Sequence, residues 1–517
     1  MKAVHEQMFE IKCIDDLRRV EERLILNLRC LYLDDVLFGI RDAEDKILPF
    51  IRAGLAQFAI RYAEPRHSGN TGSISWEQLG TSAELVASYL TADPIVFDET
   101  IRDEFYSSNP IIAFLRIAGN QFPYEVNTFA KHAQPYVLYG LMPKRIQNSP
   151  HVPKFDFDGS FERLTGVTFQ EFVDIGFVTW TAAKAHKGFT IGYYDKARAQ
   201  KMRLPRNQRI QAILNRITAD KTSFVSLYKR RKEIDRRFGP YDYNPLFEYP
   251  LIRPWPADSP VGVEHRICAP LPDLVVHRMS PGIFYEMFNE YGIKFAEYFG
   301  FLMQEYVGEI LRNSAPLVSV IAEENVRATY PEKRGTVPDW IVLEGRKAVL
   351  IECKATRFSR AALATGSEDA VDNSLKQTLK GLRQCIMFRN ACQARQVGLE
   401  QFFDITEFTI VLVSLEPLLL INSTFFRQHI NEILERQDLS EDCWIVASLQ
   451  DLELLQPHFA AGVSIASTLR RLKDETYALI LEEVTTRTGL TYRHSFLMEH
   501  DRALYERLGV HHEGVSV

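Results

Sequence analysis

The chain has 517 residues, which is too long for one ordinary hydrophobic core and predicts two or three domains. With 46% hydrophobic residues, 25% charged residues and a net charge of -6, it has the composition of a globular protein and not of a polycation. The seven cysteines are scattered without a CxxC pair, which favours reduced thiols and a cytoplasmic location. The sequence has neither the apolar run of a signal peptide nor an uncharged stretch of about 18 residues, so we expect no membrane contact.

Residues 1–255 are predicted to form a mainly helical N-terminal domain. Ile14–Leu33 and Asp45–Ala63 carry apolar residues at spacings of three and four, which is the periodicity of an amphipathic helix. Thr81–Leu90 and Asn109–Gly119 are predicted to be shorter helices. No group of residues in this region has the spacing of metal ligands or of a catalytic site, so we expect the chemistry elsewhere.

The segment 196–237 differs in charge from the rest of the chain. It contains fourteen Lys and Arg residues and three acids, a local net charge of +11. Such a segment is typical of surfaces that bind phosphate backbones. The residues predicted to contact DNA are Lys229, Arg230, Arg231, Lys232, Arg236 and Arg237. The alternative is that these charges cover a solvated helix face or form ion pairs with the acidic remainder of the chain.

Eight prolines between positions 240 and 272 predict an irregular segment, because proline lacks a backbone donor and interrupts helices. We therefore predict an extended connector over 256–284. A second domain is expected over 285–465 and a helical tail over 466–517.

Alternating helices and strands are predicted in the second domain. A helix is expected over Phe284–Leu311 and another over Asp372–Ala394, and the apolar runs Phe408–Leu415 and Cys443–Ser448 are typical of buried strands. This alternation predicts an α/β domain with a mixed central sheet flanked by helices.

The stretch VPDWIVLEGRKAVLIECKA, which begins at Val337, predicts a β-hairpin. Two apolar runs flank the Gly-Arg pair that begins at Gly345, and such a pair suits a two-residue turn. That turn would place Asp339 opposite Glu352, and the period of two would place Lys354 on the same face as Glu352. Two carboxylates about 5 Å apart repel each other, so we expect a cation between them. Oxygen ligands of this kind suit Mg²⁺.

Pro338-Asp339 followed by Glu352-Cys353-Lys354 resembles the signature of the PD-(D/E)XK nuclease superfamily, which has the restriction-endonuclease-like fold. Glu305 lies in a segment that resembles the first core helix of this superfamily, and Gln377 lies in the helix expected after the hairpin. The resemblance covers residues 285 to 460. One departure is that Gly381, not a tyrosine, stands four residues after Gln377.

The resemblance implies a Mg²⁺-dependent endonuclease that hydrolyses phosphodiester bonds of DNA, with Mn²⁺ as a possible substitute. It implies Asp339, Glu352, Glu305 and the carbonyl group of Cys353 as metal ligands, and Lys354 and Gln377 as further catalytic residues. The large helical domain before the nuclease domain is the pattern of bacterial restriction and antiphage defence proteins, by analogy. DNA is then the expected partner, with a second protein subunit or another copy of the chain as a further one.

Two alternatives to an active nuclease remain open. The chain can be a catalytically inactive nucleic-acid-binding protein, or a scaffold subunit of a defence or repair complex. The presence of all three of Asp339, Glu352 and Lys354 argues against an inactive site. The sequence does not distinguish DNA from RNA.

Overall fold

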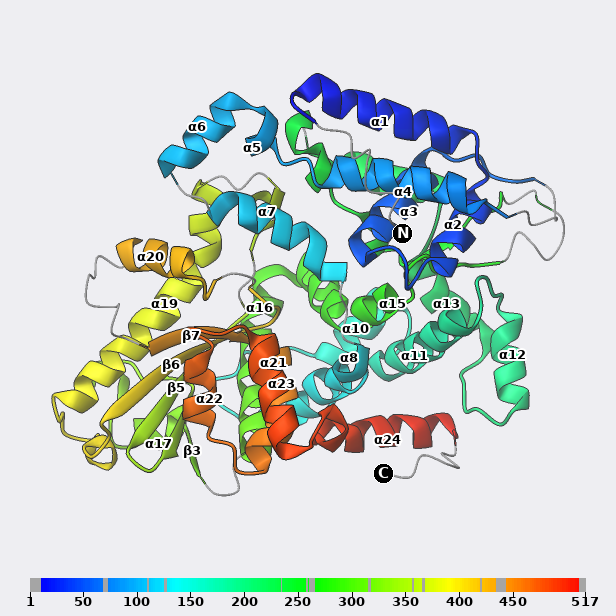
Figure 1. The fold of residues 1–517 in the computed structure, drawn as a ribbon. Coiled ribbons are helices and arrows are strands. Elements are labelled where there is room, and N and C mark those ends of the chain that lie inside the picture. Colours follow the sequence, from blue (N-terminus) through cyan, green and yellow to red (C-terminus); the bar gives the residue numbers. More distant parts are fainter. Residues whose placement is uncertain are drawn as a thin grey trace.

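The computed structural model describes residues 11–67, 73–108, 111–124, 128–233, 235–256, 259, 266–314, 318–355, 358–364, 368–418, 421–433 and 443–510. A mainly helical part, formed by the first half of the chain, adjoins a mixed sheet with its own helices (Figure 1). This division agrees with the predicted combination of a helical part and an α/β part. In the described residues, no helix is both long and apolar enough to cross a membrane.

The helical part contains fifteen α-helices among the described residues and two short strands. The helices are α1 (Ile14–Arg29), α2 (Leu33–Asp42), α3 (Pro49–Tyr62), α4 (Trp76–Leu90), α5 (Pro94–Phe97), α6 (Glu99–Ser108), α7 (Ile111–Gln121), α8 (Thr128–Pro135), α9 (Met142–Ile146), α10 (Phe157–Thr165), α11 (Phe169–Ala185), α12 (Gly192–Ala199), α13 (Asn207–Ile217), α14 (Lys221–Arg231) and α15 (Asp273–Met279). This part also contains the short 3₁₀ helices η1 (Phe122–Tyr124), η3 (Arg236–Tyr241) and η4 (Pro245–Phe247) and the π-helix η2 (Tyr136–Leu141). Strands β1 (Thr218–Asp220) and β2 (Leu251–Arg253) pair in parallel.

Local sequence explains where several of these helices begin. The Ser75 hydroxyl group accepts a hydrogen bond from the backbone N–H group of Gln78, and the backbone N–H group of Ser75 donates to the side-chain oxygen of Gln78, which caps the start of α4. Thr168 and Glu171 form the same reciprocal cap at the start of α11. The predicted helix Ile14–Leu33 is α1, which ends earlier, at Arg29, so its type is confirmed and its length is wrong.

The remaining elements build the sheet and its covering helices. They are α16 (Pro281–Ser314), β3 (Ser319–Ala322), α17 (Glu323–Arg327), η5 (Glu332–Arg334), β4 (Trp340–Glu344), β5 (Lys347–Lys354), α18 (Arg360–Ala364), α19 (Glu368–Gln393), η6 (Glu400–Phe402), β6 (Glu407–Ser414), α20 (Thr424–Ile433), β7 (Cys443–Ser448), α21 (Leu449–Ala460), α22 (Ile465–Arg471), α23 (Tyr477–Thr488), η8 (Tyr492–His494) and α24 (Leu497–Leu508).

The five-stranded sheet has the order β3-β4-β5-β6-β7. The first three strands are antiparallel neighbours, and β6 and β7 run parallel to β5. The predicted mixed sheet is therefore confirmed. Leu343 pairs with Ala348 in the hairpin, which is the predicted register.

Alternate residues of the strands enter two different hydrophobic cores. Val349 and Ile351 of β5 belong to the cluster that includes α16 and α21, whereas Ala348 and Leu350 belong to the cluster that includes α19 and α20. The period of two explains this division, because successive side chains of a strand point to opposite faces. The result is a sheet between two helical layers.

The predicted extended connector 256–284 is wrong in its later part. Residues 257, 258 and 260–265 lie outside the described residues, but Asp273–Met279 form α15, and α16 begins at Pro281. The physical reason is that proline is tolerated at the start of a helix, where its missing N–H group is not needed. In addition, one buried cluster extends from Ala133 to Leu508, so core residues from both sides of the predicted boundary pack together.

Candidate active site

The hairpin of β4 and β5 holds Asp339 and Glu352 at one end of the sheet. Gly345 has a φ of +60°, which a two-residue turn requires and glycine adopts without strain. The turn fixes the pairing up to Trp340 and Ile351, so the next residues, Asp339 and Glu352, face each other. Asp339 Oδ2 accepts a hydrogen bond of 2.6 Å from the backbone N–H group of Cys353, which fixes the aspartate against β5.

Glu352 and Lys354 form a buried ion pair on the face of the sheet that α19 covers. The distance from Lys354 Nζ to Glu352 Oε1 is 2.6 Å, and Glu352 is 2% exposed. The helix approaches closely because Gly381 has no side chain. A Cβ atom there would lie 3.2 Å from Glu352 Cγ and 3.4 Å from Lys354 Cε. The glycine therefore provides the space in which the pair lies.

Burial and mutual repulsion oppose ionisation of the two acids. Burial, followed by the charge of Glu352, raises the pKa of Asp339 well above its usual value. Burial also raises the pKa of Glu352, although the Lys354 ammonium group counteracts it. In the described residues, Glu352 Oε2 is buried without a hydrogen-bond partner. A buried carboxylate oxygen without a partner is costly, so this end of the site favours a further cation.

The electrostatic environment of Lys354 keeps it protonated. Burial lowers the pKa of this lysine, but the adjacent Glu352 carboxylate and Asp339 outweigh burial and raise it above the usual value. The side chain is therefore an ammonium group at neutral pH. It is suited to stabilise negative charge and is a poor proton acceptor in this state.

Glu323 is a third acid at this end of the sheet, and the sequence analysis missed it. Its backbone N–H group donates to the carbonyl oxygen of Asp339 at 3.0 Å, and its charge raises the pKa values of Asp339 and Glu352. Its carboxylate accepts a hydrogen bond of 2.9 Å from Arg327 Nε. The missed signal was the short apolar run of β3, which ends just before Glu323.

Helix α19 brings a different residue to the site than the predicted Gln377. Cys385 is buried, and burial together with the charges of Glu352 and Asp339 raises the pKa of its thiol well above the usual value. Gln377, one turn before Gly381, is exposed and lines a cleft beside the site. Gln377 therefore lies in the cleft beside the site, whereas Cys385 is close enough to Glu352 and Asp339 for their charges to affect its thiol.

Glu305 lies on α16, which packs against the opposite face of the sheet from α19. Its Oε1 atom is 2.5 Å from Arg312 and 3.7 Å from Arg145. Among the interactions of the described residues, none joins Glu305 to Asp339 or Glu352. The side chain of Cys353 packs toward the α16 face, and both its backbone N–H group and its thiol interact with Asp339.

The six predicted DNA-binding residues divide into two groups. Arg231 pairs with Glu248 at 2.7 Å, Arg236 with Asp242 at 3.1 Å, and Arg237 with Asp98 at 2.9 Å. Lys229, Arg230 and Lys232 are exposed and form no ion pair within the described part of the chain. The ion-pair alternative therefore describes the first group, whereas the second group is exposed.

Asp339 and Glu352 are the candidate metal ligands at this end of the sheet. Across the residues that the structure describes, no group of three or more His, Cys, Asp or Glu side chains is arranged to hold a metal ion. Two carboxylates, one of which has a buried oxygen without a partner, nevertheless fit Mg²⁺ or Mn²⁺. Mg²⁺ commonly takes one or two carboxylates and completes its shell with water and phosphate oxygens. Asp339 and Glu352 are the residues that would hold such an ion.

Comparisons of the chain with models of protein families, with curated proteins and with solved structures found no match. The support for a function therefore comes from the geometry of the chain itself.

Proposed function

We propose that this chain is a metal-dependent endonuclease that hydrolyses phosphodiester bonds of DNA. The observation that carries the proposal is the placement of Asp339 opposite Glu352, with Lys354 in contact with Glu352. Phosphodiester hydrolysis requires positive charge near the scissile phosphate and an activated water molecule. This end of the sheet provides two carboxylates for a cation and one ammonium group for the phosphate.

The residues have separate roles in the proposed reaction. Asp339, oriented by the N–H group of Cys353, and Glu352 would hold Mg²⁺ or Mn²⁺, which would supply Lewis-acid polarisation and make a water molecule more acidic. Lys354 stabilises the negative charge that develops on the phosphate, because its raised pKa keeps it protonated. Glu323 adds negative charge nearby and strengthens the attraction for a cation.

The order of elements also supports the proposal. Helix α16, the hairpin with the two acids, helix α19 with Gln377, and the parallel strand β6 follow one another as the resemblance to PD-(D/E)XK nucleases implies. We propose a role in bacterial defence against foreign DNA on analogy alone, because a large helical part precedes the proposed nuclease part. In that role, a second subunit or another copy of the chain is a proposed partner.

The test is cleavage of supercoiled plasmid, linear duplex and single-stranded DNA by the purified full chain, with Mg²⁺, Mn²⁺ or EDTA. We expect the wild type to nick plasmid only with metal, and Glu352→Gln and Lys354→Met to abolish cleavage. Lys347→Met is the matched control, because Lys347 begins the same strand far from the acids. Metal-dependent cleavage that persists in Glu352→Gln and Lys354→Met would contradict the proposal.

A further inference from the structure

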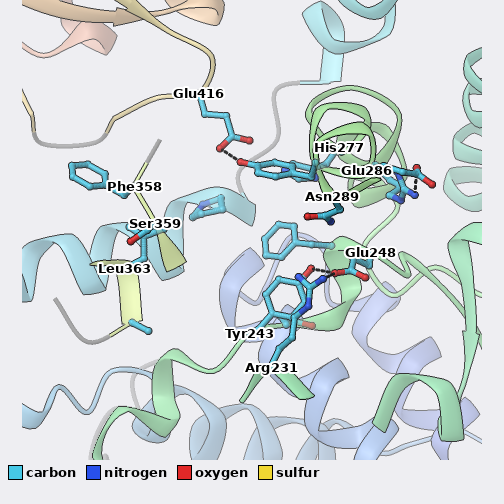
Figure 2. A pocket seen from close by; sticks show the side chains of 18 of the residues that line it. Arg231, Tyr243, Glu248, His277, Glu286, Asn289, Phe358, Ser359, Leu363 and Glu416 are labelled. Atoms are coloured by element: carbon cyan, nitrogen blue, oxygen red, sulfur yellow. Dashed lines mark hydrogen bonds and ion pairs between the residues drawn. The ribbon is translucent and has the colours of Figure 1, made fainter. Parts of the chain in front are cut away.

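A cleft of about 1120 Å³ lies between the helical part and the sheet (Figure 2). On the sheet side, Ala355 lines it directly after Lys354, and Glu416 lines it just beyond the end of β6. The cleft is therefore at the carboxyl ends of parallel strands, where open α/β sheets commonly bind ligands. Gln377 connects this cleft to the site, because it lies one helical turn before Gly381.

The helical side of the cleft is rich in aromatic rings. Phe247 stacks against Tyr124 with ring centroids 5.0 Å apart, and Tyr243 lies 6.5 Å from Phe247. All three rings line the cleft, as does the amide group of Asn289. Aromatic rings beside amide groups form a surface on which flat heterocycles stack and form hydrogen bonds.

The arginines inside the cleft pair with acidic residues, which outnumber them. Arg231 pairs with Glu248 at 2.7 Å, and Arg278 lies 2.5 Å from Glu286. Tyr285 donates a hydrogen bond to Glu416 at 2.7 Å, and Figure 2 shows Glu416 on the wall of the cleft. The interior is thus suited to uncharged aromatic groups, not to a row of phosphates.

Exposed basic residues precede and follow Arg231, which lines the cleft. Lys229 and Arg230, in the last turn of α14, and Lys232, just after it, adjoin Arg231 in sequence and are exposed. Within the described part of the chain none of the three forms an ion pair. Uncharged rings line the cleft, and exposed basic residues neighbour Arg231 in the sequence. This combination matches a single-stranded nucleic acid whose bases point into the cleft and whose phosphates stay outside it.

We infer that the cleft binds the bases of a single-stranded nucleic-acid segment that leads to Lys354. This inference rests on the proposed function and adds a substrate class to it. The volume exceeds that of most small-ligand sites, which are about 300–1,000 Å³, so it accommodates more than one nucleotide. Stacking on rings is tolerant of sequence, so the preference concerns single-stranded structure and not base identity.

The test is fluorescence anisotropy on the full chain in EDTA, with a labelled single-stranded oligonucleotide and with a duplex of the same sequence. We expect tighter binding of the single strand, and about a tenfold loss in Phe247→Ala and in Tyr243→Leu. Tyr243→Leu keeps most of the side-chain volume, and thermal melting by circular dichroism identifies a variant that fails to fold. Trp76→Ala, which changes an exposed ring on α4, is the matched control.

The outcomes separate this inference from the nuclease proposal. Equal affinity for both forms of DNA, or wild-type binding by both folded variants, would overturn the inference even if the wild type cleaves DNA. Displacement of the oligonucleotide by a free nucleoside monophosphate at equal nucleotide concentration would also overturn it, because the cleft would then be a mononucleotide site. If binding of the single strand depends on the rings but no metal-dependent cleavage is observed, the inference is supported and the nuclease proposal is refuted.

Discussion

The ammonium group of Lys354 lies 2.6 Å from Oε1 of Glu352, two residues earlier on the same strand. Side chains two positions apart share one face of a strand, so β5 alone creates this pair. It is buried beneath Gly381, with 20% of the Lys354 side chain and 2% of the Glu352 side chain exposed. The charge of each residue therefore depends on the presence of the other.

We expect Lys354→Met to destabilise the fold in a pH-dependent manner. Without the ammonium group, the pKa of Glu352 rises further above the value of about 4.3 in the unfolded chain. A carboxyl group with a raised folded-state pKa binds more protons in the folded state, so stability falls as the pH rises from the unfolded pKa through the folded one. The loss should approach about 3 kcal/mol when Glu352 is ionised. Urea unfolding in mildly acidic and mildly alkaline buffer measures it, and a pH-independent loss would contradict the explanation.

Asp339→Asn should stabilise the metal-free protein, because burial and the charge of Glu352 oppose ionisation of this aspartate. The amide oxygen of Asn can still accept the hydrogen bond from Cys353. We expect a gain of about 1 kcal/mol near neutral pH in EDTA, measured by thermal or urea unfolding. Addition of Mg²⁺ should raise the melting temperature of the wild type and not that of the variant, since binding stabilises only a protein that retains the site. If the variant is less stable than the wild type in EDTA, repulsion between Asp339 and Glu352 does not destabilise the metal-free protein.

The hairpin was predictable because its information is local. A turn at Gly345 and two apolar runs fix the register, and the register alone places Asp339 opposite Glu352. By contrast, β3 is four residues long, too short for periodicity to identify, and Glu323 was missed with it. Gly381 was noted only as a departure from a motif, whereas the structure shows that it makes room for the ion pair.

The less accurate predictions concern contacts between distant parts of the chain. The partners of Arg237 and Arg236 include Asp98 and Glu21, which are far away in sequence and whose proximity no local pattern reveals. The face of the sheet on which Glu305 lies depends on how α16 packs, which the residues of the helix do not specify by themselves. Tertiary packing therefore decides which charged residues remain free.

Asp501 provides a test of pH dependence away from the candidate site. Burial raises the pKa of this α24 residue to about 7, and it is 8% exposed. The unfolded value is about 3.9, so the folded state binds more protons between about pH 4 and pH 7, and stability falls across that range. Asp501→Asn should remove this fall, which amounts to at most about 4 kcal/mol. Urea unfolding at several pH values measures it, and an unchanged slope in the variant would show that Asp501 does not titrate in this range.

The exposed and the ion-paired basic residues should respond differently to substitution. Changing the exposed Lys229, Arg230 and Lys232 to Glu should weaken DNA binding regardless of sequence, because phosphate contacts position a nucleic acid without specifying bases. Each phosphate that the variant no longer neutralises should make the slope of log K against log salt shallower, by about 0.9 for duplex DNA or about 0.7 for a single strand. Fluorescence anisotropy in EDTA measures the slope without interference from cleavage.

Arg236→Gln is the matched control for that experiment, because Arg236 is held by Asp242 at 3.1 Å and by Glu21 at 3.3 Å. Its replacement should lower the free energy of unfolding by about 1 kcal/mol and leave the salt slope unchanged, since a paired arginine releases no counterion from DNA. If the triple variant keeps the wild-type slope, the exposed group does not contact phosphate. If instead Arg236→Gln flattens the slope, this ion pair opens when DNA binds, and the division into paired and free cations is wrong.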